Sequence, residues 1–297
     1  MKVISIKQPW ASLIIEGYKK FEFRSWATSY RGKVLIHASQ NTDKNLMDRF
    51  KSLNISYPKG QIIGSVYITD CIKVEEKFEN ELIKENELVY GNKSPERKYA
   101  FKLEKIEKFK NPINARGNLS FWNYYTEEEA LNLMNDISYG FMDKNKKIHQ
   151  NFNESFANDY ILQTPNEIIK NKVGTCWDQV ELERYYLKNN QINIKTYFLV
   201  YYDEKNCPTH TFLTYEKNNK YYWFEHAWEK YKGIHEYCNK KELLVDVKKK
   251  FIKSELNNKV LINNLILYEY KKPPKNLTVQ QFYKHCESGK KVTLNDY

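Results

Sequence analysis

The second half of the chain contains a cysteine, a histidine and a glutamate in an order that suits nucleophilic catalysis. Cys176 stands at the expected start of a helix, where the partial positive charge of the helix end favours a thiolate. His210 opens a predicted strand and, beside the thiol, would take its proton and later protonate a leaving group. Glu225 lies on the next strand of a predicted hairpin and would orient the imidazole. These residues predict acyl transfer from an amide through a thioester at Cys176.

Such a reaction also needs hydrogen-bond donors for the negatively charged oxygen that forms when the carbonyl is attacked. The backbone N–H of Cys176 is one expected donor, and a side-chain donor is the other. Gln163 and Gln179 are both candidates for the second position, and the sequence does not choose between them.

Two other interpretations of these residues stay open. A cysteine in a helix is most often a small buried hydrophobe, which would leave a non-catalytic binding module. A zinc site is the other, with Cys207 and His210 joined by a third ligand from His226, His235 or Cys238. Because the sequence has no CxxC pair, we expect no metal, and the acyl transfer needs no organic cofactor.

A second group of candidate residues lies near the N-terminus and is basic and aromatic. Lys19, Glu22 and Arg24 follow closely after the end of a predicted helix. The guanidinium groups of Arg24 and Arg31 fit phosphate, and Trp26 offers a flat face for stacking an unpaired base. The segment predicts recognition of RNA or a nucleotide, with an exposed surface ion network as the alternative.

The elements that position these residues differ between the two halves. In the second half, Thr175 is expected to cap a helix over 176–188, and helix 240–256 follows a set of strands at 195–202, 209–215 and 221–228. In the first half, strands are expected at 3–6, 33–37, 61–71 and 99–106, with helices at 9–17 and 41–53 and an irregular stretch at 75–98. The first pattern predicts an α+β domain, and the second predicts a small, strongly curved β-barrel with short helices.

Composition agrees with a folded two-domain protein of 297 residues. The net charge of +11 is uneven, since residues 1–125 contribute +8 and the remainder +3, which favours a polyanionic partner for the first half. Five cysteines form no disulfide framework, and neither a signal peptide nor a long apolar run occurs. We therefore expect a cytoplasmic protein without a membrane contact.

Residues 1–125 resemble the ASCH domain, a PUA-like β-barrel family linked to RNA binding and RNA modification. The resemblance rests on the segment Gly17–Arg24 with the pattern GxKxxExR, on strand 60–71, and on Pro112, Gly117 and Trp122 in order. Some ASCH members are amidohydrolases of acetylated cytidine that use a lysine and a threonine here. Lys19 matches the lysine, but Glu22 stands at the threonine position, so the resemblance implies binding more than catalysis.

Residues 128–240 resemble the transglutaminase-like superfamily, whose papain-like fold carries a cysteine on a helix and a histidine and an aspartate on two successive strands. Cys176 and His210 match, and Glu225 falls at the aspartate position. The expected domains are therefore 1–125 and 126–297, with 241–297 as an extension. The resemblance implies a protein or peptide substrate, without separating hydrolysis, deamidation and crosslinking. The alternatives are a non-catalytic RNA-binding protein, or an amidohydrolase or nuclease activity in the first domain.

Overall fold

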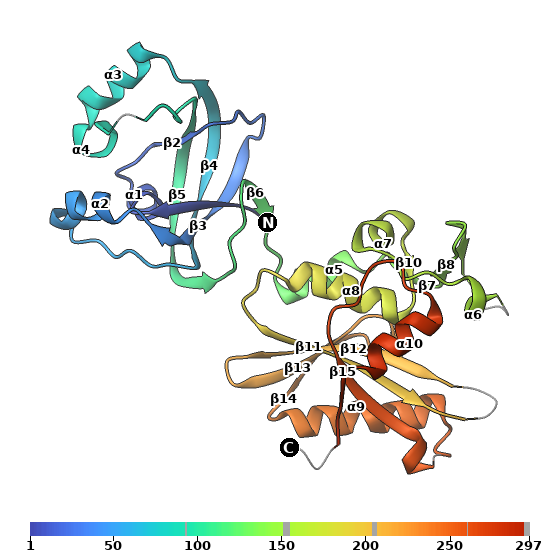
Figure 1. Cartoon of the computed structure of the whole chain (residues 1–297). Helices are drawn as coiled ribbons and strands as arrows, with labels where there is room; N and C mark the ends of the chain where they lie inside the picture. The colour runs from blue at the N-terminus through green and yellow to red at the C-terminus, as the bar shows by residue number, and fades with distance from the viewer. Residues whose placement is uncertain (93, 151–154, 204–206, 260, 294–297) are drawn as a thin grey trace. The chain divides into compact units, whose positions relative to one another are not determined.

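The computed structural model of the protein describes residues 1–92, 94–150, 155–203, 207–259 and 261–293. The chain divides into two compact units. The N-terminal unit comprises Met1–Tyr124 together with Asn189–Gln191, and the C-terminal unit comprises Tyr125–Lys188 and Ile192–Tyr297 (Figure 1). The mixed α+β class expected from the sequence is confirmed.

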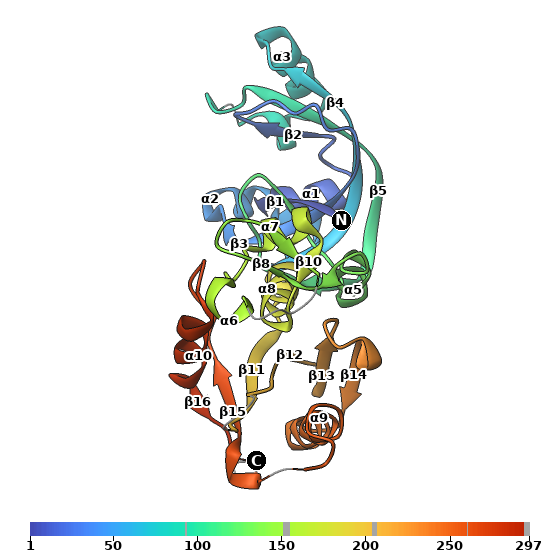
Figure 2. The same cartoon turned by 90° about the vertical axis from the view of Figure 1, so that its right-hand side faces the viewer.

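The described residues of the N-terminal unit form a six-stranded sheet with the order β2-β5-β4-β3-β1-β6. Its strands are β1 (Lys2–Gln8), β2 (Phe21–Arg24), β3 (Gly32–Thr42), β4 (Gln61–Lys73), β5 (Tyr99–Asn114) and β6 (Phe121–Asn123). β1 and β3 are parallel, and the other neighbours are antiparallel. Figure 2 shows β4 and β5 side by side as long, bent strands.

This sheet curls until side chains from its edge regions meet. The rings of Phe101 on β5 and Phe121 on β6 are stacked with centroids 6.3 Å apart, and Trp26 contacts both edge-on. They share one apolar core with residues of β1, β3 and β4. The expectation of a strongly curved β unit therefore agrees with the packing.

Short helices cover part of the N-terminal sheet. They are α1 (Trp10–Ile15), α2 (Lys44–Met47), the 3-10 helix η1 (Asp48–Leu53), α3 (Glu76–Glu85) and α4 (Glu87–Tyr90). Two expectations were wrong. Residues 41 and 42 end β3 instead of starting a helix, and the stretch 75–98 contains α3 and α4. Dense charge hid the helical spacing of Phe78 and Leu82, which pack with Phe21 in a separate apolar cluster.

The described residues of the C-terminal unit form a second six-stranded sheet with the order β14-β13-β12-β11-β15-β16. Its strands are β11 (Asn193–Tyr201), β12 (Thr209–Lys217), β13 (Lys220–Glu225), β14 (Gly233–Tyr237), β15 (Leu265–Tyr270) and β16 (Lys290–Lys291). Asn218 and Asn219 adopt positive φ angles in the turn between β12 and β13, a conformation that asparagine tolerates. The turn sets β12 and β13 antiparallel, as the hairpin pattern predicted.

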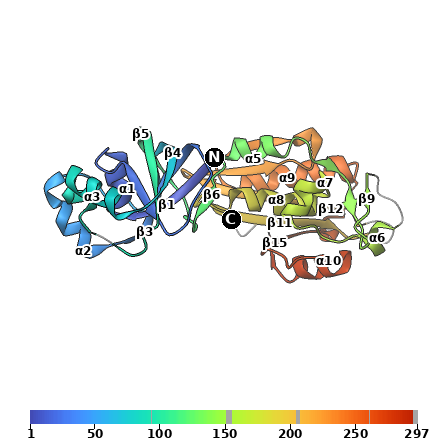
Figure 3. The ribbon, with the colours of Figure 1, turned by 90° about the horizontal axis from the view of Figure 1, so that it is seen from above.

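Two helices cover opposite faces of this sheet, as Figures 1 and 2 show: α8 (Cys176–Leu187) and α9 (Lys240–Glu255). On β11, Phe198 and Val200 belong to the core that contains α8, whereas Tyr197 and Leu199 belong to the core that contains α9. This alternation is what a strand buried on both faces requires. Figure 3 shows α10 (Val279–Glu287) beside β15.

The remaining elements of the C-terminal unit are short. They are α5 (Glu127–Leu133), α6 (Phe156–Asp159), α7 (Pro165–Asn171), η2 (Glu229–Tyr231), η3 (Ile262–Asn264) and the strand pairs β7 (Ser138–Tyr139) with β10 (Val173–Gly174) and β8 (Phe141–Met142) with β9 (Ile148–His149). None of the helices in the described part of the chain is long and apolar enough to cross a bilayer.

Candidate active site

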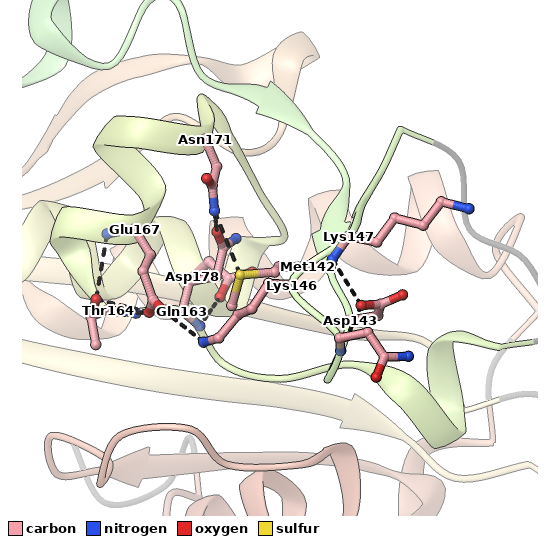
Figure 4. Close-up of polar contacts among 10 residues, drawn as sticks. Met142, Asp143, Lys146, Lys147, Gln163, Thr164, Glu167, Asn171 and Asp178 are labelled. Carbon is pink, nitrogen blue, oxygen red and sulfur yellow. Dashed lines mark hydrogen bonds and ion pairs between the residues drawn. The ribbon is translucent and has the colours of Figure 1, made fainter.

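Cys176 is the first residue of α8, and a network of buried hydrogen bonds fixes this helix end. The Thr175 hydroxyl accepts from the Asp178 backbone N–H, while Asp178 Oδ2 accepts from the Thr175 N–H and Oγ1 at 2.9 Å each. Asp178 Oδ1 accepts from the Gln163 N–H at 2.8 Å and from the Tyr160 hydroxyl at 3.1 Å. Figure 4 shows Gln163 and Asp178 among these contacts. The predicted helix start and its Thr175 cap are confirmed.

The carboxyl group of Asp178 is fully buried. Burial raises its pKa, and hydrogen bonds from Gln163, Thr175 and Tyr160 limit the rise, so that the pKa is about 6. Four donors on one carboxylate hold the loop before α8 against the helix. Asp178 therefore fixes the position of Cys176 at the start of the helix.

His210 lies on β12 and is buried between a carboxylate and the thiol. Its Nε2 hydrogen-bonds to Glu225 Oε2 at 2.8 Å. The Cys176 side chain lies close enough to the ring to help raise the pKa of His210. Since Nε2 is used by the carboxylate, Nδ1 is the ring nitrogen left for the thiol. The structure thus brings together the three residues named from the sequence.

Burial alone would lower the pKa of His210. The attraction of Glu225 and the hydrogen bonds to Cys176 and Glu225 outweigh burial and raise it to about 10. Glu225 is itself held, because its Oε1 accepts the Trp228 backbone N–H at 2.8 Å. The indole of Trp228 lies against the imidazole, with centroids 4.6 Å apart. The imidazole is therefore fixed in orientation and retains a proton at neutral pH.

The two glutamines proposed as oxyanion donors are engaged with the short strand β10. Gln163 Nε2 donates to the Val173 carbonyl at 2.9 Å, and Gln179 Nε2 donates to the Gly174 carbonyl at 2.8 Å. Their amide oxygens are bonded as well, to Asn171 Nδ2 and to His226 Nδ1. Both side chains hold the strand that leads into Cys176.

Sequence reasoning missed Tyr139. β7 pairs with β10 so that Tyr139 is opposite Gly174, two residues before Cys176. The Tyr139 side chain lies close enough to Cys176 for the thiol to affect the pKa of the phenol. Burial and the neighbouring thiol raise the pKa of Tyr139 well above its usual value, although 45% of the whole residue is exposed. No motif marks Tyr139, and only the pairing of two-residue strands reveals it.

The histidines of the zinc interpretation have other partners. His226 Nδ1 bonds to Gln179 Oε1 at 2.6 Å, and His235 Nε2 bonds to the Tyr231 carbonyl at 2.7 Å. Burial lowers the pKa of His226 to about 4, so this ring is neutral. Within the described ranges, no three His, Cys, Asp or Glu side chains gather as a metal ligand set.

In the N-terminal unit, Lys19, Glu22 and Arg24 form a nearly buried ion network. Lys19 Nζ contacts Glu22 Oε2 at 2.6 Å and the Phe21 carbonyl at 2.5 Å. Arg24 Nη2 contacts Glu22 Oε1 at 3.1 Å and the Ser5 carbonyl at 2.9 Å. Burial lowers the pKa of Lys19 despite its pairing with Glu22; burial would raise the pKa of Glu22, but the two cations lower it. This buried network differs from the exposed ion network that was the alternative.

The ion network lies at a cavity of about 910 Å³. Among its lining residues are the network itself, two indoles and two further arginines: Lys19, Glu22, Arg24, Trp10, Trp26, Arg97 and Arg116. Arg31 is not among the described residues that line it; it pairs with Asp70 at 3.0 Å on the surface. The structure therefore groups four of the five predicted binding residues and separates Arg31 from them.

Comparison with known proteins identifies the first part of the chain. Residues 4–112 match the family described as the ASCH domain. Activating signal cointegrator 1 from Homo sapiens is 35% identical over 81 residues, and the same protein from Mus musculus is equally similar. Each match covers 23% of this chain and only 14% of the length of the relative.

Solved structures are also similar to this chain. The crystal structure of ASCH from Zymomonas mobilis aligns over 44% of this chain and 92% of that chain, with 19% sequence identity and a TM-score of 0.30. A serine-to-alanine mutant of the same protein aligns over the same shares, with 18% identity and a TM-score of 0.30.

Proposed function

We propose, from the premise that residues 4–112 form an ASCH domain, that the protein joins nucleotide or RNA binding to cysteine-dependent acyl transfer. The acyl transfer belongs to the C-terminal unit and acts on an amide of a protein or peptide. The observation that carries this proposal is the convergence of Cys176, His210 and Glu225 in one buried site. A nucleophile, a base and a group that orients the base are the minimum set for this chemistry.

The proposed reaction begins from an ion pair in which His210 already holds the proton of Cys176, and the thiolate sulfur attacks the carbonyl carbon of the amide. An S–C bond forms, and the carbonyl electron pair moves to oxygen. When that pair returns, the C–N bond breaks, and His210 gives its proton to the departing amine. The resulting thioester is cleaved by water in hydrolysis or deamidation, or by a second amine in crosslinking. In each case His210 takes a proton from the incoming nucleophile, and the sulfur leaves.

Electrostatics supports this role for His210. With its pKa raised to about 10, the ring keeps a proton after it has taken one from the thiol. The carboxylate of Glu225, 2.8 Å away, offsets the positive charge of the ring. The extra methylene of glutamate relative to aspartate is accommodated, because the Trp228 N–H anchors the other carboxylate oxygen.

Selective alkylation tests the acyl-transfer proposal. Iodoacetamide at neutral pH is expected to modify Cys176 at least about tenfold faster than the exposed Cys207 and Cys238, because His210 lies beside Cys176. Peptide mapping by mass spectrometry measures the five rates separately. The buried Cys286 is the matched control, because burial raises the pKa of its thiol. Modification of Cys176 no faster than of Cys207 would defeat the proposal.

Binding of a nucleotide in the N-terminal cavity is the second part of the proposal. Two indoles and several cations line a cavity large enough for a nucleotide-sized ligand. Within the described part of the chain, the buried Nε of Arg24 has no hydrogen-bond partner, although Nη2 has two. A buried donor of this kind favours a ligand that accepts a hydrogen bond there.

Titration with a fluorescent single-stranded oligoribonucleotide at several salt concentrations tests this part. Binding is expected to weaken steadily as salt increases, because phosphate contacts release counterions. Arg24→Ala removes a residue of the cavity, whereas Arg31→Ala removes an arginine outside it. Binding that ignores salt and responds equally to both substitutions contradicts a nucleotide site in this cavity.

A further inference from the structure

We propose that Arg116 binds a phosphate group of the nucleotide or RNA in the N-terminal cavity, and that Asn189 holds Arg116 in position. The inference rests on the proposed nucleotide binding and adds two residues to it. Two observations support it. One is the ion pairing of the cations that line the cavity, and the other is the set of hydrogen bonds that fix the loop containing Arg116.

Three cations of the cavity lining are already paired with a carboxylate. Lys19 and Arg24 share Glu22, at 2.6 Å and 3.1 Å. Arg97 pairs with Glu79 at 3.2 Å, and both of these side chains are largely buried. A phosphate that approached these three cations would compete with the carboxylate that each already contacts. This part of the lining therefore suits a neutral hydrogen-bond acceptor better than a phosphate.

Arg116 lines the same cavity and differs from these three cations. In the described part of the chain its guanidinium forms no ion pair, and the residue is exposed. Asp43 and Glu96 also line the cavity, and neither of these described carboxylates pairs with Arg116. Lys7 on β1 is the other lining cation without an ion pair among the described residues. A guanidinium donates two parallel hydrogen bonds to a phosphate, which a lysine does not, so Arg116 is the better phosphate ligand of the two.

Asn189 fixes the loop that contains Arg116 and connects β5 to β6. The backbone N–H of Arg116 donates to the Asn189 carbonyl at 2.8 Å. The Asn189 side chain accepts from Asn118 Nδ2 at 3.0 Å and donates to the Asn123 carbonyl at 3.1 Å. Asn189 is only 4% exposed, so water competes little for these bonds. One asparagine therefore holds the loop at Arg116 and at two later positions.

The carbonyl of the preceding residue, Ala115, is held from two sides. It accepts from Gln191 Nε2 at 2.6 Å and from His37 Nε2 at 3.0 Å. The hydrogen on His37 Nε2 follows from the contacts of the other ring nitrogen. Because Ser5 Oγ accepts from Trp122 Nε1 at 3.0 Å, its own O–H is left to donate to His37 Nδ1 at 3.1 Å. Burial lowers the pKa of His37, in agreement with a neutral ring.

Gly117, the residue after Arg116, lies close against the sheet. A Cβ at this position would be 2.4 Å from His37 Cε1 and 2.9 Å from Ser5 Oγ, so a larger residue does not fit. The backbone of Arg116 is thus held by both neighbours and by its own N–H, and only its side chain remains to be ordered. Less conformational entropy is then lost when the guanidinium binds phosphate.

The proposed phosphate site is built from two separate stretches of the sequence. Asn189 and Gln191 follow α8 in the chain, but both belong to the N-terminal unit. Gln191 also lines the cavity. Arg116 and Asn189 both lie outside residues 4–112, so the stretch that matches the ASCH domain contains neither of them.

Titration of full-length variants with a fluorescent single-stranded oligoribonucleotide tests the role of Arg116. Arg116→Gln is expected to weaken binding by about tenfold and to reduce the slope of log Kd against log salt by about 0.7, the value for one phosphate contact on a single strand. The matched control is Arg31→Gln, which removes the same charge from an exposed arginine paired with Asp70 and should change the affinity by less than about twofold. Competition with unlabelled uridine monophosphate and with unlabelled oligoribonucleotide distinguishes a single nucleotide from a strand as the source of the phosphate.

A double-mutant cycle tests the positioning role of Asn189. Asn189→Ala is expected to weaken binding by about fivefold in the unchanged protein but by less than about twofold in Arg116→Gln, because the asparagine acts through the arginine. Thermal unfolding midpoints show whether each variant is folded at the temperature of the titration. If Asn189→Ala weakens binding equally in both proteins, the asparagine supports the unit as a whole, and its positioning role is wrong.

The remaining outcomes separate this inference from the proposed nucleotide binding. Equal weakening in Arg116→Gln and Arg31→Gln would reflect net charge alone and would overturn the assignment of Arg116, as would an unchanged salt slope in Arg116→Gln. Because the Arg116 side chain is exposed, this variant should keep the unfolding midpoint of the unchanged protein, so its result does not depend on how stable Asn189→Ala is. If the unchanged protein does not bind the oligoribonucleotide, nucleotide binding itself fails, whereas undiminished binding by Arg116→Gln removes only Arg116 from the site.

Discussion

Two buried clusters of this molecule use ion pairs differently. In the N-terminal unit, Glu22 is held by both Lys19 and Arg24, so the charges satisfy one another at the edge of a cavity. In the C-terminal unit, Glu225 is paired with His210, and the opposite side of the imidazole meets a thiol. The first arrangement is suited to hold a ligand, and the second is suited to move a proton. Both clusters contain buried charges, so burial alone does not distinguish a ligand-binding site from a proton-transfer site. The difference lies in the groups beside the charges, a cavity in one unit and a thiol in the other.

Removal of the imidazole should have the largest effect. His210→Ala is expected to slow acylation of Cys176 by p-nitrophenyl acetate by about 10⁴-fold, because the base and its orienting partner act as one unit. The release of nitrophenolate measures the rate. His285→Ala is the control, since this histidine bonds to the Lys271 carbonyl away from the site. A decrease in the acylation rate of less than about tenfold would contradict a proton-transfer role for the cluster in the C-terminal unit.

The pH dependence of the free energy of unfolding tests whether His210 is charged in the folded protein. The folded pKa of His210 is raised to about 10 from an ordinary value of 6.5, so its stabilising contribution is complete below pH 6.5 and is lost as pH rises through 10. Relative to His210→Gln, the free energy of unfolding should fall by about 1.4 kcal/mol per pH unit in this window. Urea unfolding from pH 6 to pH 10 measures it. Parallel curves for the two proteins would show that His210 is not charged in the folded state.

The next prediction concerns the buried hydrogen bonds of Asp178, which hold the start of α8 in place. Asp178→Ala removes an acceptor of four buried hydrogen bonds and should lower the free energy of unfolding by about 3 kcal/mol. Thermal or urea unfolding reports the change. The control is Asp159→Ala, which removes the partner of Lys144 on the surface. An equal decrease in the free energy of unfolding in both variants would mean that the hydrogen bonds of Asp178 do not stabilise the start of α8.

The smallest expected effect concerns the N-terminal cluster. Glu22→Gln keeps the shape of the side chain but removes the charge that neutralises Lys19 and Arg24. We expect the affinity for a single-stranded oligoribonucleotide to change by about tenfold, while Arg31→Ala changes it by less than about twofold. Fluorescence polarisation measures both. A larger change in affinity for Arg31→Ala than for Glu22→Gln would indicate that the ligand binds outside the cavity.

Local rules predicted the elements that carry the proposed catalytic residues. Thr175 and the residues after it define a capped helix start, and the asparagines between β12 and β13 define a tight turn. Both features depend on neighbours in sequence, so the pattern is visible without a structure. The cysteine, histidine and glutamate could be named because their order alone suggested the chemistry.

Features that depend on contacts between residues far apart in the chain could not be predicted from the sequence. β7 and β10, which pair beside Cys176, are separated by more than thirty residues, and each is only two residues long, too short for a periodic pattern. The assignment of Asn189–Gln191 to the N-terminal unit, where Gln191 Nε2 donates to the Ala115 carbonyl at 2.6 Å, is likewise set by contacts distant in sequence. Arg31 stays a predicted phosphate ligand, and its pairing with Asp70 on β4 is a contact that the sequence pattern did not show.

The most direct test of cysteine-dependent acyl transfer is the location of the covalent intermediate. After brief reaction with p-nitrophenyl acetate and an acid quench, peptide mapping should find an acetyl group on Cys176, and this group should be absent from His210→Ala. Acetyl groups spread over the exposed Cys207, Cys238 and surface lysines, unchanged by the loss of His210, would contradict acyl transfer at Cys176.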